Sequence, residues 1–231
     1  MKKYLSISIA SILALSAPGI AKAQFYITAD IGGVPTVSGA TLENFDEPTP
    51  SILTLSGSAN LVTGANYGVA YYPPYFSGST AAFFGESPTS GFDNSQYVAV
   101  EFGDSASATL SFPTPQKYLG LLWGSVGVSD SLTFYDSANN VIGTVLGTDV
   151  PGAVFNGQVG LSNTSYVNIT STTAFSSVVA TSPASSFEFD DVAYAQVVPE
   201  PASSVLFGAE LCILGFALRW KFAKSAGIEL D

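Results

Sequence analysis

Short apolar runs that alternate with serine and threonine fill the middle of this chain, and they constrain its fold more than any other feature. In Ala108-Thr109-Leu110-Ser111-Phe112, apolar and hydroxyl side chains take turns. This period of two is the pattern of a half-buried strand, and no stretch between residues 24 and 196 shows a convincing helical period. The runs that predict strands are 25–27, 51–55, 97–102, 108–112, 118–123, 131–135, 141–145, 165–169, 177–180 and 187–194.

Turn-forming residues separate these runs. The segment Asp136-Ser137-Ala138-Asn139-Asn140 lies between two of them and predicts a hairpin turn, because Asp and Asn tolerate tight backbone conformations. Many short strands with such connections predict an all-β fold, a single β-sandwich that is jelly-roll-like rather than immunoglobulin-like. The stretch from Gln24 to about Pro201 has the length of one ordinary domain.

The first 23 residues have the layout of a secretory signal peptide. Lys2 and Lys3 are followed by an apolar stretch, and Ala21 and Ala23 supply the small residues that a signal peptidase inspects. Cleavage is expected before Gln24, so signal peptidase and the general secretion machinery are expected partners. The alternative is a membrane anchor, for which the apolar stretch is too short.

The chain ends in three consecutive parts. Pro199-Glu200-Pro201 precedes an apolar segment at 202–218, and Arg219, Lys221 and Lys224 follow it. The segment has the length of a short transmembrane helix, and the positive charges after it predict that the tail stays in the cytoplasm. The alternative is an amphipathic helix buried against the domain. Pro199 and Pro201 weaken that alternative, because they break the chain just before the segment.

These three parts, over residues 197–231, resemble a PEP-CTERM sorting signal, which exosortase processes in Gram-negative bacteria. The sequence departs from that pattern at Glu210 and Cys212 and at its acidic end. The body is also similar to a family of exosortase-dependent surface proteins, in the segments 118–126, 132–136 and 187–194. The resemblance implies a transient inner-membrane anchor, followed by a place on the cell surface, on the outer membrane or in the extracellular matrix.

The charge and the missing residue types of the body exclude several function classes. Of 18 acidic residues, 15 lie between Gln24 and Pro201, where Lys117 is the single basic residue. So acidic a domain repels phosphate backbones, which excludes nucleic acid as a partner. The chain has no histidine, and its single cysteine is Cys212. Ser-His-Asp catalysis and His-ligated zinc are therefore impossible, and the body is expected not to be an enzyme.

Two acidic segments near opposite ends of the body suggest a metal site. Glu43 and Asp46 lie near its start, and Asp190 and Asp191 near its end. The first and last strands of a sandwich can be neighbours, so these carboxylates are candidate ligands of a structural calcium ion. The alternative is two unrelated solvated turns. No other cofactor is expected.

A proline-containing loop concentrates aromatic side chains at Tyr71, Tyr72, Tyr75 and Phe76. Exposed aromatic rings stack on sugars, so this loop is a candidate polysaccharide-binding platform, although such residues more often cap a core. The leading hypothesis is a non-catalytic, exported surface or extracellular-matrix protein with envelope polysaccharide as its ligand. The alternative is a secreted glycan hydrolase that uses carboxylates.

Overall fold

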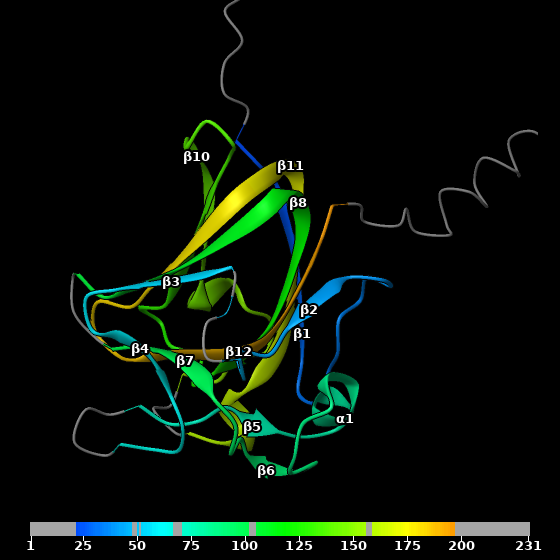
Figure 1. Cartoon of the computed structure of the whole chain (residues 1–231), viewed down its shortest axis with the longest axis vertical. Helices are drawn as coiled ribbons and strands as arrows, with labels where there is room; N and C mark the ends of the chain where they lie inside the picture. The colour runs from blue at the N-terminus through cyan, green and yellow to red at the C-terminus, as the bar shows by residue number, and fades with distance from the viewer. Residues whose placement is uncertain are drawn as a thin grey trace, which may run out of the picture.

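A computed structural model describes residues 22–47, 50, 52–66, 71–101, 105–155 and 159–196 (Figure 1). The predicted signal peptide, with Ala21, and the whole sorting segment lie outside these residues, so both remain predictions. Ala23 is described, and its backbone nitrogen donates a hydrogen bond to the carbonyl of Ile142. In the part of the chain that the structure describes, no helix has the length and apolar character needed to cross a membrane.

The domain is mostly antiparallel β-sheet, which confirms the predicted all-β class. Short helices interrupt it: α1 (Thr80–Phe84) and the 3-10 turns Gly147–Asp149 and Leu161–Asn163. The strands are β1 (Phe25–Asp30), β2 (Thr41–Glu43), β3 (Leu53–Ser56), β4 (Ala59–Val62), β5 (Tyr75–Phe76), β6 (Gly91–Phe92), β7 (Tyr97–Val100), β8 (Ser107–Gly124), β9 (Ser131–Tyr135), β10 (Val141–Leu146), β11 (Ser165–Thr181) and β12 (Phe187–Ala195).

Two long, bent strands organise this sheet. The sequence predicts two strands within β8 and two within β11, but each pair is one continuous strand. The bend in β8 follows Pro113 and Pro115, and the pairing of β8 with β11 shifts register at the same level. Both long strands curve through the molecule in Figure 1.

Because of this bend, the sheet folds back on itself and its two halves face each other. In one half, β3 and the first part of β8 lie beside the last part of β11, followed by β9 and β10. In the other half, the last part of β8 lies between β12 and the first part of β11, with β7, β4 and β2 beyond β12 and β1 beyond β11. The predicted hairpin turn joins β9 to β10, as expected.

The main core lies between the two halves. Trp123 of β8 is fully buried, and its ring stacks on Phe187 of β12 with centroids 4.5 Å apart. In the other half, Phe134 of β9 packs edge-on against Phe175 of β11. Large aromatic side chains supply much of the area buried here, which matters in a domain without disulfides.

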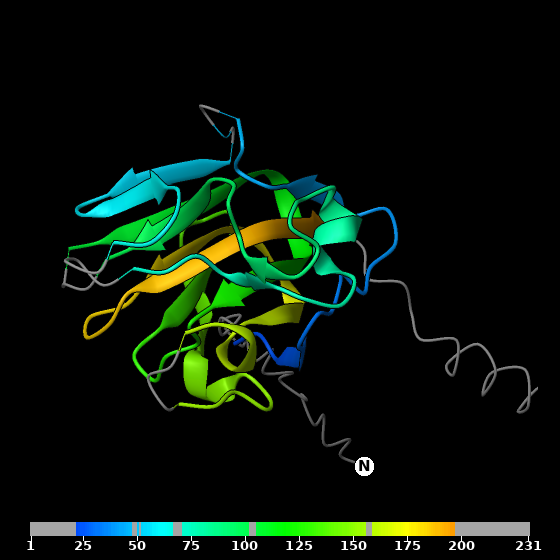
Figure 2. The same ribbon diagram turned by 90° about the horizontal axis from the view of Figure 1, so that it is seen from below.

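A smaller layer covers the outer face of the sheet. Successive residues of a strand point to opposite faces, so Leu122 points away from the core that contains Trp123. Leu122 and Tyr166 instead pack against Phe76 and Ala81. These contacts hold the segment of β5, α1 and β6 against the sheet, where Figure 2 shows α1 beside β12. The polar residues described next lie between this layer and β12.

Candidate functional site

A bulge in β12 places two carboxylates side by side. The pairing of β12 with β8 shifts register between Asp190 and Ala193, and Asp191 takes a left-handed backbone conformation with φ 52°. An extra residue in a strand redirects side chains and is common near functional sites. Both aspartates are fully buried, although carboxylates are almost never fully buried without a partner.

Three further carboxylates approach this bulge from the surrounding loops. Asp46 follows β2, Glu86 follows α1 and Asp93 follows β6. The charges of all three act on Asp191, and that of Asp93 also acts on Asp190. We call these five residues the carboxylate cluster: Asp46, Glu86, Asp93, Asp190 and Asp191.

Local hydrogen bonds hold the outer members of the carboxylate cluster. The side-chain nitrogen of Asn44 donates to Oδ2 of Asp46 at 3.1 Å and to Oε1 of Glu86 at 2.6 Å. The backbone nitrogen of Gln96 donates to Oδ1 of Asp46 at 3.2 Å. Oδ1 of Asp93 accepts from the backbone nitrogen of Ser95 at 2.7 Å. Side-chain and backbone amide groups therefore satisfy the carboxylates at one edge of the cluster.

The inner edge of the cluster is not satisfied. Five buried oxygen atoms there have no hydrogen-bond partner: both carboxylate oxygens of Asp191, Oδ2 of Asp190, Oδ2 of Asp93 and Oε1 of the neighbouring Gln96. Most buried polar atoms in proteins are paired, so five unpaired oxygens in one place require a physical cause. All five are acceptors when the carboxyls are ionised. The carboxyls of Asp190 and Asp93 also lie within hydrogen-bonding reach of each other, so either a proton shared between them or a cation would satisfy this pair.

Burial and mutual repulsion alter the acidity of the inner carboxyls. Burial raises the pKa of Asp190 well above its usual value, and the charge of Asp191 raises it further. Burial likewise raises the pKa of Asp191, with Glu86 adding to the effect. Burial also raises the pKa of Glu86, which its bond from Asn44 partly offsets. Without a cation, the cluster therefore favours protonated carboxyls.

The predicted metal ligands are brought together in part. β2 pairs with β12, so the early and late acidic segments are neighbours, as the sequence argument requires. The charge of Asp46 acts on Asp191. The carboxylate of Glu43 accepts a hydrogen bond from the backbone nitrogen of Phe45, and Glu43 pairs with Val192 in the strand ladder. The sequence argument missed Glu86 and Asp93, which approach only because the layer of α1 and β6 folds over β12.

The cluster is not a preformed metal cage. Within the described ranges, no three Asp, Glu, His or Cys side chains are already positioned to hold a metal ion. The prediction that calcium binds here therefore remains a prediction, and an ion would have to draw the outer carboxylates inward.

A groove lies next to the cluster. It consists of two cavities of about 350 and 770 Å³ that share Tyr72 and Val159. Phe155 and Glu188 line the smaller cavity, and Phe92 lines the larger one. Phe92 and Phe155 are each 44% exposed, so both offer ring faces to a ligand. We call this surface the groove. Asp93 lines its larger cavity and so belongs to both the groove and the cluster.

Glu188 is the acidic residue among those that line the smaller cavity. Its Oε1 accepts a hydrogen bond of 3.3 Å from the backbone nitrogen of Tyr72, while its buried Oε2 has no hydrogen-bond partner. Burial raises the pKa of Glu188 to about 8, and the charge of Asp130 contributes to the rise. At neutral pH this side chain is mostly a neutral carboxylic acid, which can donate a hydrogen bond to a ligand.

The predicted aromatic platform is partly correct in position. Tyr72 lines both cavities of the groove, and Tyr75 meets Phe92 edge-on with centroids 5.2 Å apart. Tyr71 packs edge-on against Tyr97. The prediction is wrong for Phe76, which is fully buried beneath the outer layer and cannot stack on an external sugar. Phe92 and Phe155 were missed, because isolated aromatics give no pattern in the sequence.

Comparisons with known proteins give no family. No protein-family model matches the chain, and no curated protein matches it. The fold is similar to the K2 cleaved adhesin domain of Lys-gingipain, with a TM-score of 0.36 and 10% identity over 68% of this chain and 99% of that one. It is also similar to the enzymatically active domain of tailspike protein 4 of bacteriophage CBA120, with a TM-score of 0.21 and 12% identity over 78% of this chain and 20% of that one. Both likenesses are too distant to bear on function.

Proposed function

We propose that this chain is a non-catalytic, exported surface or extracellular-matrix protein that binds a neutral polysaccharide in its groove. The groove is the observation that supports binding. Its two cavities fall in the size range of ligand sites and combine half-exposed aromatic rings with a few polar groups. Sugar rings stack on aromatic faces through their C–H surfaces, and their hydroxyls pair with groups such as the Glu188 carboxyl.

The charge of the domain selects among polysaccharides. The body carries 15 acidic residues, and Asp93 lines the groove. An anionic polymer would be repelled over the whole surface. A neutral glucan or galactan would not be repelled, so neutral polysaccharides are the proposed class of ligand.

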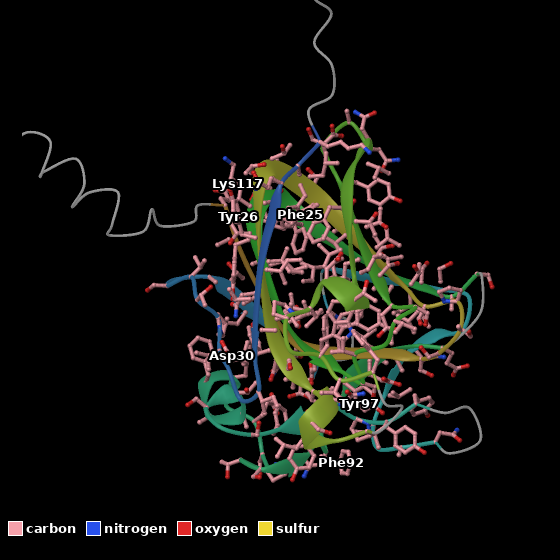
Figure 3. All side chains as sticks on the ribbon, turned by 180° about the vertical axis from the view of Figure 1, so that it is seen from behind. Phe25, Tyr26, Asp30, Phe92, Tyr97 and Lys117 are labelled. Atoms are coloured by element: carbon pink, nitrogen blue, oxygen red, sulfur yellow. The ribbon has the colours of Figure 1, made fainter. Side chains whose placement is uncertain are left out.

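Affinity electrophoresis of the purified chain in gels that contain polysaccharide tests this binding. We expect retardation by one or more neutral glucans or galactans, and none by alginate, an acidic polymer. Tyr72→Ala and Phe92→Ala should each weaken retention about five- to thirtyfold, because an aromatic face in a binding site contributes on the order of 1–2 kcal/mol. Tyr26→Ala is the matched control, since Tyr26 is 57% exposed on β1, at the other end of the domain from Phe92 (Figure 3). Equal retention of all variants would refute the groove.

Export and sorting are tested separately, by intact mass. Signal cleavage at Ala23 and exosortase processing near Pro201 both predict defined termini. The protein from cells with exosortase should have a mass that begins at Gln24 and ends near Pro201, and cells without exosortase should retain the tail. A retained tail in both strains would contradict sorting without affecting the binding proposal.

A second candidate, a carboxylate-dependent glycan hydrolase, is favoured by Glu188 alone. A protonated carboxyl in a cavity is suited to be a general acid. Glycosidases commonly need a second carboxylate across the scissile bond, and the described lining of the smaller cavity contains no other acid. Release of reducing sugar from a polysaccharide that binds, abolished by Glu188→Gln, would favour this function over simple binding.

A further inference from the structure

The buried oxygens of the carboxylate cluster that have no hydrogen-bond partner mark the position that a ligand would occupy. Asp191 is fully buried and presents two such oxygens, and Asp190 and Asp93 present one each. Gln96 adds a neutral amide oxygen. A buried carboxylate without a donor or counter-charge is strongly destabilising. Four residues from two segments, the β6–β7 connection and β12, share this deficit, so a single species that accepts several oxygens would relieve all of it.

The protein itself offers no positive charge for this purpose. In the described residues the cationic side chains are Lys22 and Lys117. Lys117 lies at the opposite end of the domain from Phe92, the residue that precedes Asp93 (Figure 3). Protons or a cation from solution must therefore relieve the repulsion between these carboxyls.

We propose that the carboxylate cluster binds one Ca²⁺ ion, held by Asp93, Asp190 and Asp191 with the amide oxygen of Gln96. Asp46 and Glu86 would complete the shell from the adjacent loops. This site goes beyond the proposed polysaccharide binding and does not depend on it.

The ligand chemistry selects calcium among common ions. The donors are carboxylate and amide oxygens, which suit hard cations, and the chain has no histidine to favour zinc or copper. Calcium accepts six to eight oxygens in irregular geometry, whereas magnesium demands a near-ideal octahedron. Six residues from loops and a bulged strand match the calcium pattern better.

The site forms around the ion and is not preformed. Asp190 and Asp191 are fixed in the buried bulge, but Asp46 is exposed and Glu86 is half-buried, and both lie on loops. Their side chains can rotate inward when an ion neutralises the repulsion between carboxylates. The described residues contain no preformed three-ligand group, so the buried side chains of Asp93, Asp190 and Asp191 must also shift when an ion binds. This rearrangement predicts the modest affinity of extracellular calcium modules, with Kd on the order of 10⁻⁴ to 10⁻³ M.

Calorimetric titration of the EDTA-treated, dialysed chain with CaCl₂ tests the site, together with thermal unfolding. We expect one Ca²⁺ ion to bind per chain, with the modest affinity given above. At 10 mM CaCl₂, ten or more times the expected Kd, the midpoint of unfolding should rise by several degrees. MgCl₂ at the same concentration should give a clearly smaller rise. No rise with Ca²⁺, or an equal rise with Mg²⁺, would overturn the assignment.

Isosteric variants separate a cation site from a merely protonated cluster. Asp190→Asn and Asp191→Asn each remove one negative charge and keep the shape. Each should raise the unfolding midpoint in EDTA, because an amide spares folding the cost of protonating or burying a carboxyl. Each should also weaken Ca²⁺ binding at least tenfold. Stabilisation in EDTA also shows that these variants fold.

Asp136→Asn is the matched control, since it removes one exposed carboxylate from the β9–β10 hairpin, at the far end of the domain from β5, β6 and α1 (Figure 1). It should leave the Ca²⁺ affinity unchanged. Wild-type affinity in both cluster variants would refute the proposal.

Discussion

The indole nitrogen of Trp123 donates a hydrogen bond of 3.2 Å to Oδ2 of Asp130 inside the domain. The same carboxylate accepts from the backbone nitrogen of Gly127 and from the hydroxyl of Ser182, each at 2.8 Å. Asp130 is fully buried. It therefore ties the end of β8 to the connection between β11 and β12, and it satisfies the one polar atom of the central tryptophan.

Replacement of Asp130 by Asn should change how stability depends on pH. Burial raises the pKa of Asp130 from its ordinary value of 3.8 to about 6, although hydrogen bonds from Ser182 and Gly127 lower it. The folded protein then holds this proton more tightly than the unfolded chain does. The resulting stabilisation is complete below pH 3.8 and is lost as the pH rises through 6, a total of about 3 kcal/mol.

Urea unfolding of wild type and Asp130→Asn at pH 4, 5, 6 and 7 measures this effect. Other buried acids contribute a slope of the same sign, so the difference between the two proteins isolates Asp130. The unfolding free energy of wild type should fall relative to that of the variant by about 2 kcal/mol between pH 4 and 6 and level off by pH 7. Parallel curves would mean that Asp130 does not titrate in this window.

The stacked pair of Trp123 and Phe187 predicts a large loss of stability when the side chain of Phe187 is truncated. Phe187 lies on Trp123 with an interplanar angle of 18° and is fully buried. Phe187→Ala should lower the unfolding free energy by about 3–5 kcal/mol, because it removes buried area and leaves a cavity. Tyr26→Ala, at an exposed position, should cost under about 0.5 kcal/mol. Equal losses for the two variants in urea unfolding would contradict this packing.

Gly147 follows β10 where two backbone segments touch. A Cβ at this position would lie 1.9 Å from the carbonyl oxygen of Gly127, so alanine requires the backbone to move. Gly39 has φ +74° and open space around it, so alanine there adds only conformational strain. Gly147→Ala should therefore destabilise by more than about 3 kcal/mol, against about 1 kcal/mol for Gly39→Ala. Thermal unfolding of both variants checks the order, and a reversed order would contradict the close approach.

Local sequence patterns predict the strands of this fold but not how those strands continue. The run at 131–135 matches β9, and the Asp136 turn places β10 correctly, because alternation and turn chemistry are local signals. Pro113 and Pro115 indicate a break between two strands. Instead β8 runs through both prolines at the bend, where β11 lacks regular pairing with it. That outcome depends on the packing of the two sheet halves, which no local pattern encodes.

The site was predictable to the extent that strand order brings distant acids together. Asp46, Asp190 and Asp191 were predicted because they belong to acidic segments near the two ends of the body. Strand β2, which no predicted run covers, pairs with β12 and makes these segments neighbours. Glu86 and Asp93 were not, because their position depends on Phe76 packing on the outer face of the sheet. The same contact buried Phe76 and removed it from the predicted platform.

Asp93 links the two proposals and gives a final prediction. Its unpartnered Oδ2 belongs to the carboxylate cluster, while the residue itself lines the larger cavity beside Phe92. Its backbone nitrogen also donates to the carbonyl of Pro74, which connects β6 to the aromatic loop. A cation on Asp93 would therefore fix one wall of the groove.

Removal of calcium with EDTA should accordingly weaken polysaccharide retention, and Asp93→Asn should weaken both retention and Ca²⁺ affinity. Phe92→Ala should weaken retention alone, because its ring offers no oxygen to the ion. Affinity electrophoresis with 1 mM CaCl₂ or 1 mM EDTA, alongside calorimetry of each variant, measures both quantities. Full retention in EDTA would show that the groove holds its shape without the ion, since Asp93 would then be fixed by its bond from Ser95 and by Pro74 alone.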